Sequence, residues 1–471
     1  MCNNTSHRHL GKTISSNRTP PHTHTLHTQP RRTRHIYHKG HKPMHALIEQ
    51  LQQDEPLTFT QGVQHFSDRC PMLLDLQHTE QDPIWHAEGN VAIHTSMVID
   101  ATETLLEESS IKRTDEQRLA LRLAALFHDI AKPVTTRTEE KDGRMCVLAP
   151  KHAKRGRSYL AYRLASLLQP TTYLEVLQLV AHHHAPIQLP IRNKQAPAYH
   201  KIARKVDTRS LYMLSMADML GRTCDDQQTQ IDYVHFFQLE CENYGYWEPY
   251  NPQKDWSGLL EQLTAYPIIT QERILMESIW EYERGLYFHP EEAIARSYDK
   301  QKECAEVYIM CGPSGSGKST WIEANHKGKK IISLDRLREL HTGKRADQKH
   351  NAHVLHDARE SFKQCLRDKQ AVIWDATNLR FDFRNVLFDI ARQYGAHVTL
   401  VVACPRLKTL HKRNKKRTHP IKRSALDRQI NSFQWPDLDE AHRMIFIDEK
   451  GECLDDTRTR FFPHQAKAPT K

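Results

Sequence analysis

The sequence predicts two folded domains: an all-α domain, followed by an α/β domain with a mainly parallel sheet. Between about residues 90 and 245 apolar residues recur with helical spacing, and Leu119, Leu123, Leu126 and Ile130 fall on one helix face. From about residue 300, short apolar runs alternate with helical segments, a pattern typical of a parallel sheet covered on both faces. The length of 471 residues is consistent with two domains and terminal tails.

Composition excludes an integral membrane protein. The hydrophobic content is 38%, and no apolar run approaches the roughly 18 residues that a spanning helix needs. The 10 cysteines are scattered and form no C-x-x-C pair, unlike a disulfide scaffold or a zinc finger. We therefore expect reduced thiols, a cytoplasmic location and no membrane partner.

The first 43 residues differ from the rest of the chain. They hold eight basic residues and eight of the 31 histidines, and the first acidic residue is Glu49. We expect a disordered tail there, or a true translation start at Met44. Without this tail the formal net charge falls from +10 to +2, so any nucleic-acid binding must depend on local basic patches. The expected organisation is a tail over 1–43, a helical domain with a helical connector over 44–300, an α/β domain over 301–451, and a C-terminal tail over 452–471.

Histidine and aspartate side chains form an ordered series in the helical domain. His128 and Asp129 end one predicted helix, and the other members lie on or beside separate helices. Imidazole and carboxylate groups from several helices are a ligand set for divalent transition metals, so the series predicts a metal site. Its members are His94, His128, Asp129, His152, one of His182–His184, and Asp218.

This series resembles that of the HD phosphohydrolase superfamily. The resemblance implies one or two divalent ions, of Mn, Fe, Co, Ni or Zn, in the helical domain. It implies one metal on His94, His128, Asp129 and Asp218, and a second on His152 and His183, with Asp129 bridging.

Several choices around this series come from local spacing. Among the three consecutive histidines His183 is our preferred ligand, and His182 is the alternative because HHHAP resembles the family's His-His-x-x-Pro stretch. Lys132 and Arg222 follow Asp129 and Asp218 by about one helical turn, so both cations are expected to face a substrate phosphate.

The α/β domain contains a phosphate-binding loop. The apolar run at 307–311 leads into Gly-Pro-Ser-Gly-Ser-Gly-Lys-Ser-Thr, which matches G-x-x-x-x-G-K-[ST] between a strand and a helix. In such a loop Lys318 reaches the β- and γ-phosphates and Ser319 ligates Mg²⁺. We therefore predict a site for Mg-ATP or another nucleoside triphosphate, formed by Gly312, Gly315, Gly317, Lys318, Ser319 and Thr320.

Polar residues that follow the later strands indicate the chemistry. Strands are predicted over 330–334, 371–377, 397–403 and 444–448. Asp335 follows the first of these and is a candidate general base for an attacking hydroxyl, or else it caps the next helix. The stretch Lys408–Arg423 has eight basic residues and no acidic one, which predicts a lid over bound phosphates.

The segments GPSGSGKSTW, SLDRLR, WDATN and KRNKKR resemble the polynucleotide 5′-kinase family. This resemblance implies that Asp335 is the general base for a 5′-hydroxyl and that Arg338 positions the acceptor phosphate. It also implies that Arg413 and Arg417 are lid arginines.

Together, the two domains resemble the bacterial HD-Pnk family of RNA end-healing enzymes over about residues 85–450. The resemblance implies that the helical domain removes 2′,3′-cyclic phosphate and 2′-phosphate ends, and that the α/β domain phosphorylates 5′-hydroxyl ends. The partners would be RNA ends, with DNA ends as an alternative, and a separate ligase, because the chain shows no K-x-D-G motif.

Two other functions remain open from the residues alone. The chain is alternatively a kinase for nucleosides or small nucleotides fused to a nucleotide phosphohydrolase, or a kinase regulated by a nucleotide-sensing helical domain. The basic stretch Lys408–Arg423 favours a polynucleotide over a nucleoside acceptor, because a nucleoside needs fewer phosphate contacts. The aromatic-rich stretch from about 225 to 300 is expected to pack in the core or between domains.

Overall fold

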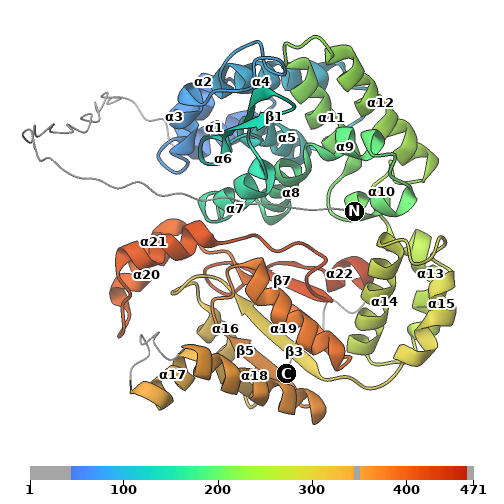
Figure 1. Cartoon of the computed structure of the whole chain (residues 1–471), viewed down its shortest axis with the longest axis vertical. Helices are drawn as coiled ribbons and strands as arrows, with labels where there is room; N and C mark the ends of the chain where they lie inside the picture. Colours follow the sequence, from blue (N-terminus) through green and yellow to red (C-terminus); the bar gives the residue numbers. More distant parts are fainter. Residues whose placement is uncertain (1–43, 344–350, 464–471) are drawn as a thin grey trace, which may run out of the picture. The chain divides into compact units, whose positions relative to one another are not determined.

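The N-terminal half of the chain is helical apart from one hairpin. The structure, a computed structural model, describes residues 44–343 and 351–463. The tail expected over 1–43 lies outside the described residues. The elements of this half (Figure 1) are α1 (Met44–Gln52), α2 (Phe59–Phe66), α3 (Met72–Asp75), η1 (Leu76–His78), α4 (Val91–Glu108), α5 (Asp115–Phe127), α6 (Lys132–Thr135), β1 (Arg137–Lys141), β2 (Arg144–Leu148), α7 (His152–Leu164), α8 (Pro170–His182), α9 (Ala185–Ile191), α10 (Ala196–Ala203), α11 (Thr208–Leu220), α12 (Gln227–Asn243), α13 (Pro252–Leu263), α14 (Ile268–Glu283), α15 (Glu292–Ser297) and η2 (Tyr298–Lys300).

Helix α5 is central to this half. A capping box fixes its start, since the Thr114 side chain accepts a hydrogen bond from Gln117 N while the Gln117 side chain accepts one from Thr114 N. Its residues from Leu119 to Phe127 are all buried, and the helix packs against α4, α8 and α11. Because α5 ends at Phe127, the His128–Asp129 pair that follows it is placed in the interior of the helical half.

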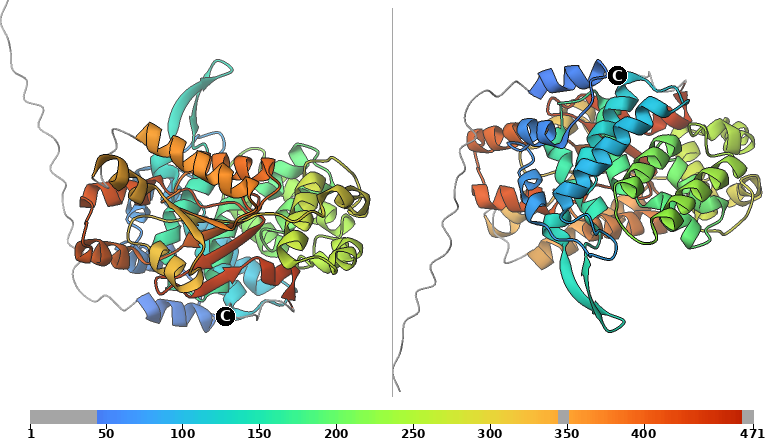
Figure 2. Two further views of the ribbon diagram at one scale, coloured as in Figure 1. Left: turned by 90° about the horizontal axis from the view of Figure 1, so that it is seen from below. Right: turned by 90° about the horizontal axis from the view of Figure 1, so that it is seen from above.

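A β-hairpin that was not predicted from the sequence precedes α7. Strands β1 and β2 pair antiparallel, and the turn residues Asp142 and Gly143 both have positive φ, at 52° and 76°. An Asp-Gly pair with this backbone favours the tight turn of a hairpin. The hairpin projects from the rest of the molecule (Figure 2) and returns the chain to His152 at the start of α7.

The C-terminal half is an α/β domain. Its elements are β3 (Glu306–Cys311), α16 (Lys318–Asn325), β4 (Lys330–Ser333), α17 (Leu334–Thr342), α18 (Asn351–Arg367), β5 (Val372–Asp375), α19 (Phe381–Gln393), β6 (His397–Ala403), α20 (Leu407–Lys416), α21 (Arg423–Ser432), β7 (Arg443–Ile447), β8 (Cys453–Asp456) and α22 (Arg458–Phe461).

The sheet of this half is mainly parallel, as the strand–helix alternation predicts. Its strand order is β4-β5-β3-β6-β7-β8, and β8 pairs antiparallel with β7. The central strand β3 leads directly into the phosphate-binding loop. The domain continues beyond the expected boundary at residue 451, because β8 adds a strand to the sheet and α22 follows it.

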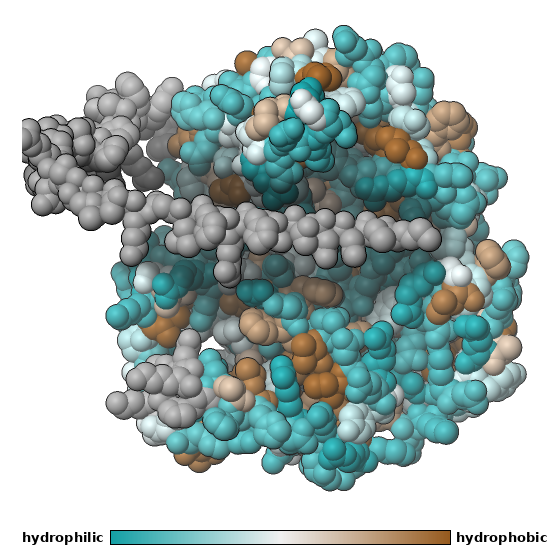
Figure 3. Space-filling view, in the orientation of Figure 1, coloured by the Kyte–Doolittle hydropathy of each residue, from teal (hydrophilic) through white to brown (hydrophobic). Residues whose placement is uncertain are grey.

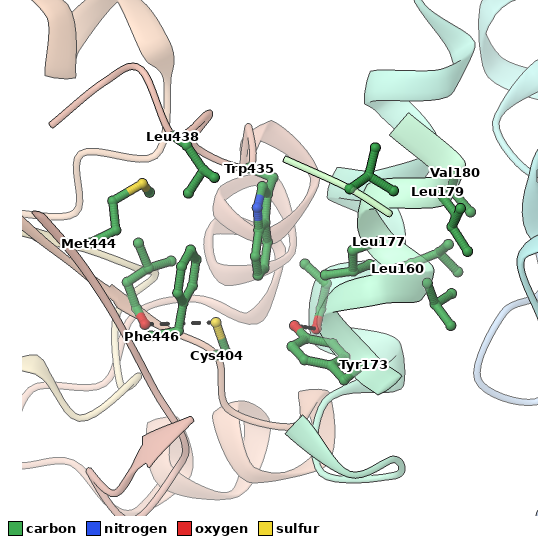
Figure 4. Packing of buried hydrophobic residues seen from close by; sticks show 14 of the residues in the cluster. Leu160, Tyr173, Leu177, Leu179, Val180, Cys404, Trp435, Leu438, Met444 and Phe446 are labelled. Carbon is green, nitrogen blue, oxygen red and sulfur yellow. Dashed lines mark hydrogen bonds between the residues drawn. The ribbon is translucent and has the colours of Figure 1, made fainter. Parts of the chain in front are cut away.

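The two halves share one hydrophobic core. The described residues from 44 onward form one compact unit, and a single cluster of buried apolar side chains includes members of both halves. Trp435 stacks on Phe446 with ring centroids 5.1 Å apart, and its other neighbours include Tyr173 of α8 at 6.1 Å (Figure 4). Aromatic pairs at these separations add attraction to the burial of their area. The aromatic-rich stretch also packs inward at Trp256, Trp280 and Tyr282.

The face of the molecule seen in Figure 3 is mainly hydrophilic, with separate apolar patches. Among the described residues, no helix combines the length and the apolar character needed to cross a membrane.

Candidate metal centre and phosphate-binding site

Four histidines of the helical half point their Nε2 atoms toward one another and their Nδ1 atoms toward the main chain. Each Nδ1 atom lies 2.6–3.0 Å from a main-chain carbonyl oxygen. A carbonyl oxygen only accepts hydrogen bonds, so each Nδ1 carries a proton, and in the neutral ring each Nε2 keeps a free lone pair. The pairs of histidine and carbonyl are His94 with Gly221, His128 with Ala125, His152 with Ala149, and His183 with Val180.

These Nε2 atoms converge on two carboxylates. His94 Nε2 lies 3.1 Å from Asp218 Oδ1 and 3.3 Å from His128 Nε2. Asp129 lies between the histidines, because its Oδ2 is 3.2 Å from His128 Nε2 and its Oδ1 is 3.1 Å from His152 Nε2. Helices α4, α5, α7 and α11 thus bring the predicted ligands together.

This donor set fits a divalent metal. Lone pairs on neighbouring Nε2 atoms repel one another unless a cation lies among them, and the Nδ1 contacts leave no ring proton to share. Asp129 Oδ1 is buried and lacks a hydrogen-bond partner among the described residues. Imidazole nitrogens oriented by main-chain carbonyls, together with carboxylates, are typical of transition-metal sites.

The three consecutive histidines have different surroundings. His183 is fully buried, and its Nε2 lies 3.4 Å from His152 Nε2. His184 Nε2 lies 3.0 Å from the same atom, so His152, His183 and His184 form one potential ligand group. His182, the alternative ligand, does not join that group. Its Nε2 is buried and has no partner among the described residues.

Two cations neutralise the carboxylates of the centre. Lys132 Nζ lies 2.7 Å from Asp129 Oδ2, and an Arg222 nitrogen lies 3.0 Å from Asp218 Oδ2. Burial opposes ionisation of both acids, but these cations and the adjacent histidines hold the pKa of Asp129 and of Asp218 well below its ordinary value. Lys132 also donates to Gln81 Oε1 at 2.6 Å.

The sequence analysis missed two residues beside His94. Glu88 Oε1 lies 3.1 Å from His94 Nδ1 and 2.7 Å from His86 Nδ1, and its other oxygen accepts from Thr223 N at 2.9 Å. His86, Glu88 and His94 form a further potential ligand group. Their segment before α4 has no regular periodicity, so only their proximity in sequence to His94 could have indicated them.

The phosphate-binding loop in the C-terminal half connects β3 to α16. Gly312, Gly315 and Gly317 have φ angles of 150°, 81° and 102°, which glycine adopts without the steric cost of a Cβ atom. A Cβ atom on Gly312 would lie 2.8 Å from Ser316 Oγ. Lys318 begins α16, and its ammonium group donates to Gly312 O at 2.9 Å and to Pro313 O at 3.0 Å.

Two opposite charges at the loop, Lys318 of α16 and Asp375 at the end of β5, influence each other's pKa. Lys318 is buried, and burial lowers its pKa, although Asp375 at the end of β5 opposes that shift. Burial likewise raises the pKa of Asp375, and Lys318 opposes it. Ser319 and Thr320 are exposed in the first turn of α16. Asp375 was not among the predicted site residues, although it lies within a predicted strand and ends β5.

Asp335 and Arg338 lie on α17, beyond the end of β4. The residue that precedes this helix is Ser333, so Asp335 lies inside the first turn rather than at its cap. Arg338 Nη1 lies 2.5 Å from Asp335 Oδ1, and the Asp335 side chain is 60% exposed. The acid is therefore accessible to a substrate hydroxyl.

The basic stretch Lys408–Arg423 forms most of α20 and ends at the first residue of α21, and both helices contact the loop. A Cβ atom on Gly317 would lie 3.3 Å from Arg413 Nη1, and Ser314 N donates to Gln429 Oε1 at 2.8 Å. Arg417 Nη1 is buried without a partner among the described residues, and its charge contributes to the lowered pKa of Lys318. Both predicted lid arginines thus lie close to the phosphate-binding loop.

Comparison with known families agrees with the division of the chain into a helical half and an α/β half. The profile described as "HD domain" matches residues 91–218, and the profile described as "AAA domain" matches residues 307–436. The first range holds the converging histidines and carboxylates, and the second holds the phosphate-binding loop, Asp335 and both lid arginines. The chain therefore contains an HD domain followed by a P-loop domain of the kinase-like type.

Individual relatives cover only part of the chain. The 2′,3′-cyclic-nucleotide 3′-phosphodiesterases of Rattus norvegicus and Mus musculus are each 34% identical over 103 residues, which are 21% of this chain and 24% of the relative. The chain thus spans about a quarter of the length of these curated relatives. A sugar kinase structure from Janibacter sp. HTCC2649 matches 32% of this chain and 87% of its own, at 21% identity and a TM-score of 0.25, a likeness that supports no functional conclusion.

Proposed function

We propose that this protein heals broken RNA ends by two reactions. Its P-loop domain phosphorylates 5′-hydroxyl ends, and its HD domain hydrolyses 2′,3′-cyclic phosphate and 2′-phosphate ends. The observation that carries the proposal is that a buried centre of four converging imidazoles and two cation-paired carboxylates lies in one compact unit with a kinase-type phosphate loop. The name of the curated relatives, which refers to 2′,3′-cyclic nucleotides, supports the same substrate chemistry.

In the HD domain, His94, His128, Asp129 and Asp218 would hold one divalent ion, and His152, His183 and Asp129 a second. A bound divalent metal supplies a Lewis acid and lowers the pKa of water. Lys132 and Arg222 bind the anionic phosphoryl oxygens and keep Asp129 and Asp218 ionised. Water first opens the cyclic ester by breaking the bond between phosphorus and one ribose oxygen, which leaves a phosphate monoester. A second water then hydrolyses this monoester and releases phosphate.

In the P-loop domain, the backbone N–H groups of the loop and Lys318 bind the donor phosphates. Asp335 accepts the proton of the 5′-hydroxyl while the hydroxyl oxygen attacks the γ-phosphorus. The bond between the γ-phosphorus and the β-phosphate breaks in the same step. Arg338 positions the acceptor phosphate, while Arg413 and Arg417 stabilise the charge in transfer. The products, a 5′-phosphate and a 2′,3′-diol, would suit a separate ligase.

End-group analysis tests both reactions. A model RNA with a 5′-hydroxyl and a 2′,3′-cyclic phosphate is incubated with ATP, Mg²⁺ and Mn²⁺, Co²⁺, Ni²⁺ or Zn²⁺. We expect Asp129→Asn to abolish phosphate release and leave 5′-phosphorylation intact, and Asp335→Ala to do the reverse. If each variant kept the activity assigned to its domain, the two site assignments would be wrong.

The acceptor is tested in the same assay with nucleosides and with DNA ends. Phosphorylation of nucleosides as efficiently as of 5′-hydroxyl oligonucleotides would identify a small-nucleotide kinase instead. Absence of any metal-dependent phosphate release, with nucleotide-dependent changes in kinase rate, would identify a sensing HD domain.

A further inference from the structure

A basic cavity lies where the end of α7 meets α20. It has a volume of about 550 Å³. Its cations come from both halves of the chain, and its one carboxylate among the described lining residues is Asp68. The cations are Arg69, Arg163, Arg406, Lys408 and Lys412.

Most of these cations are not neutralised by the protein. Arg406 is paired with Glu449. Within residues 44–343 and 351–463, no ion pair is formed by Arg69, Lys408 or Lys412. The Arg163 guanidinium stacks on the Tyr159 ring at 3.6 Å, and its Nε is buried without a hydrogen-bond partner in the same part of the chain. Unpaired cations around a cavity favour an anionic ligand.

The cavity and the phosphate-binding loop flank the same helix. On α20, Leu410 and Arg413 face the loop, since a Cβ atom on Gly315 would lie 3.8 Å from Leu410 O and 3.8 Å from Arg413 Cβ. Lys408 and Lys412 are four residues apart, so they share one face of α20, and that face lines the cavity. Helix α20 therefore carries two sets of cations with different neighbours.

The cavity is also separate from the metal centre. His152 begins α7 and Arg163 lies 11 residues later, so the two ends are about 16 Å apart along the helix. Lys408 and Lys412 belong to the basic stretch that the sequence predicts as a lid, but they line the cavity, whereas Arg413 of the same helix lies beside the phosphate-binding loop.

We propose that this cavity binds the sugar–phosphate backbone of a single-stranded nucleic acid, downstream of the 5′ end that the kinase phosphorylates. The inference rests on the proposed function and adds a second, non-reacting contact with the same strand. Four cations without an ion-pair partner among the described residues, on two walls, suit a row of phosphates better than one compact anion. Backbone contacts of this kind are largely independent of sequence.

Binding and kinetics of a double variant test the proposal. Lys408→Ala/Lys412→Ala is compared with Lys112→Ala/Lys302→Ala, which removes two exposed lysines that do not line the cavity. Fluorescence anisotropy of a 5′-hydroxyl 20-mer RNA is measured across a salt titration. Each lost phosphate contact should lower the slope of log affinity against log salt by about 0.7, so we expect a change of about 1.4 for the cavity variant and none for the control.

Kinetics separate the cavity from the reaction centre. The KM for the 20-mer should rise about tenfold in the cavity variant, while the KM for a nucleoside 3′-phosphate and for ATP should stay unchanged. Arg69→Ala, on the opposite wall, should raise the same KM. The proposal would be overturned by a salt slope that does not change in the cavity variant, or by an equal rise in the KM for the nucleoside 3′-phosphate. Competition by tripolyphosphate as strong as that by unlabelled RNA would also overturn it.

The same measurements distinguish this inference from the proposed function. If the cavity variant showed the expected change in salt slope but the wild-type protein did not phosphorylate RNA, the proposed kinase function would be wrong and the cavity proposal would stand. If it phosphorylated RNA and the cavity variant matched the control, only the cavity proposal would be wrong.

Discussion

Main-chain carbonyls orient four imidazoles of the candidate metal centre, and the Glu88 side chain also helps to orient the His94 ring. Glu88 accepts from His94 and His86 and from Thr223 N, so it joins the segment before α4 to the turn after α11. Groups that orient a ligand ring in this way commonly change metal affinity when they are removed.

We expect Glu88→Gln to weaken metal binding in the HD domain about 10- to 100-fold. The amide keeps the shape of the side chain but loses the charge that holds the His94 Nδ1 proton. Mn²⁺ titration by calorimetry measures the affinity, and excess metal should restore phosphate release. Glu80→Gln, at an exposed acid, is the control. Equal affinities for the two variants would show that Glu88 does not orient the ligand.

Glu175 of α8 makes stability depend on pH. Burial raises the pKa of Glu175 from 4.5 to about 8, and Oε1 has no partner among the described residues. Between these values the folded protein retains a proton that the unfolded chain releases, so the free energy of unfolding falls as pH rises from 4.5 to 8.

We expect Glu175→Gln to remove this dependence, because the amide has no proton to lose. The gain in stability at pH 8 over the wild type should be of order 2 kcal/mol, since the side chain is only half-buried. Urea denaturation at pH 5 and pH 8 measures it. A wild-type stability that rises over this range would contradict the sign.

At the residue scale, the sequence indicates the candidate ligands that follow an ordered series but not those that depend on packing. His94, His128, Asp129 and Asp218 lie on or at the ends of regular helices, and their order in the chain is visible. Residues such as Glu88 and His184 are recognised only when the distances to His94 and His152 are known, because neither belongs to a periodic pattern.

At the element scale, the segment Phe433–Glu440 between α21 and β7 joins the two halves. Trp435 N donates to Ser158 Oγ of α7 at 3.0 Å. Asp437 Oδ1 lies 2.8 Å from an Arg157 nitrogen, and Asp439 Oδ2 lies 2.9 Å from Lys205 Nζ. This segment follows α21, whose Gln429 contacts the phosphate-binding loop. The segment itself binds α7, which begins with His152.

We expect Asp437→Ala to destabilise the protein by about 3 kcal/mol, because it leaves the buried Arg157 guanidinium without its carboxylate. Burial opposes ionisation of Asp437, but Arg157, Lys205 and Lys154 hold its pKa well below the ordinary value.

The wild type should therefore hold this contribution above about pH 4 and lose it as the pH falls further. Urea denaturation measures the loss, with Asp382→Ala as the control because that acid forms an exposed pair with Arg380. The control should cost under about 0.5 kcal/mol. Equal losses would show that Asp437 does not hold the interface.

Elements with an apolar pattern were predictable, whereas polar strands were not. The sequence predicted strands at β3, β4, β5, β6 and β7 because each contains a short apolar run, which is mostly buried except in β4. It missed β1, whose sequence RTEEK is mostly exposed, and β8, which ends in two aspartates. Such strands form through backbone pairing with a neighbour, and this leaves no alternation in the sequence.

At the scale of the whole molecule, the shared core predicts one unfolding transition. Helix α8 and strand β7 meet through Tyr173, Trp435 and Phe446, so neither half can unfold without exposing apolar surface of the other. The division into two domains is visible in the sequence, but this interface is not, since it is formed by residues more than 200 positions apart.

We expect calorimetry of the full chain to show one cooperative transition, with equal calorimetric and van't Hoff enthalpies. Trp435→Ala should lower its midpoint by removing about 3 to 5 kcal/mol from the stability of both halves together. Two separate transitions in the wild type, or loss of helical signal from one half only, would contradict a shared core.

The stacking of Trp435 between the halves also has a consequence for the stoichiometry of the two sites. Because both sites belong to one folding unit, they are synthesised, folded and degraded together in a fixed one-to-one ratio. Differential expression or turnover therefore cannot change the ratio of the two sites.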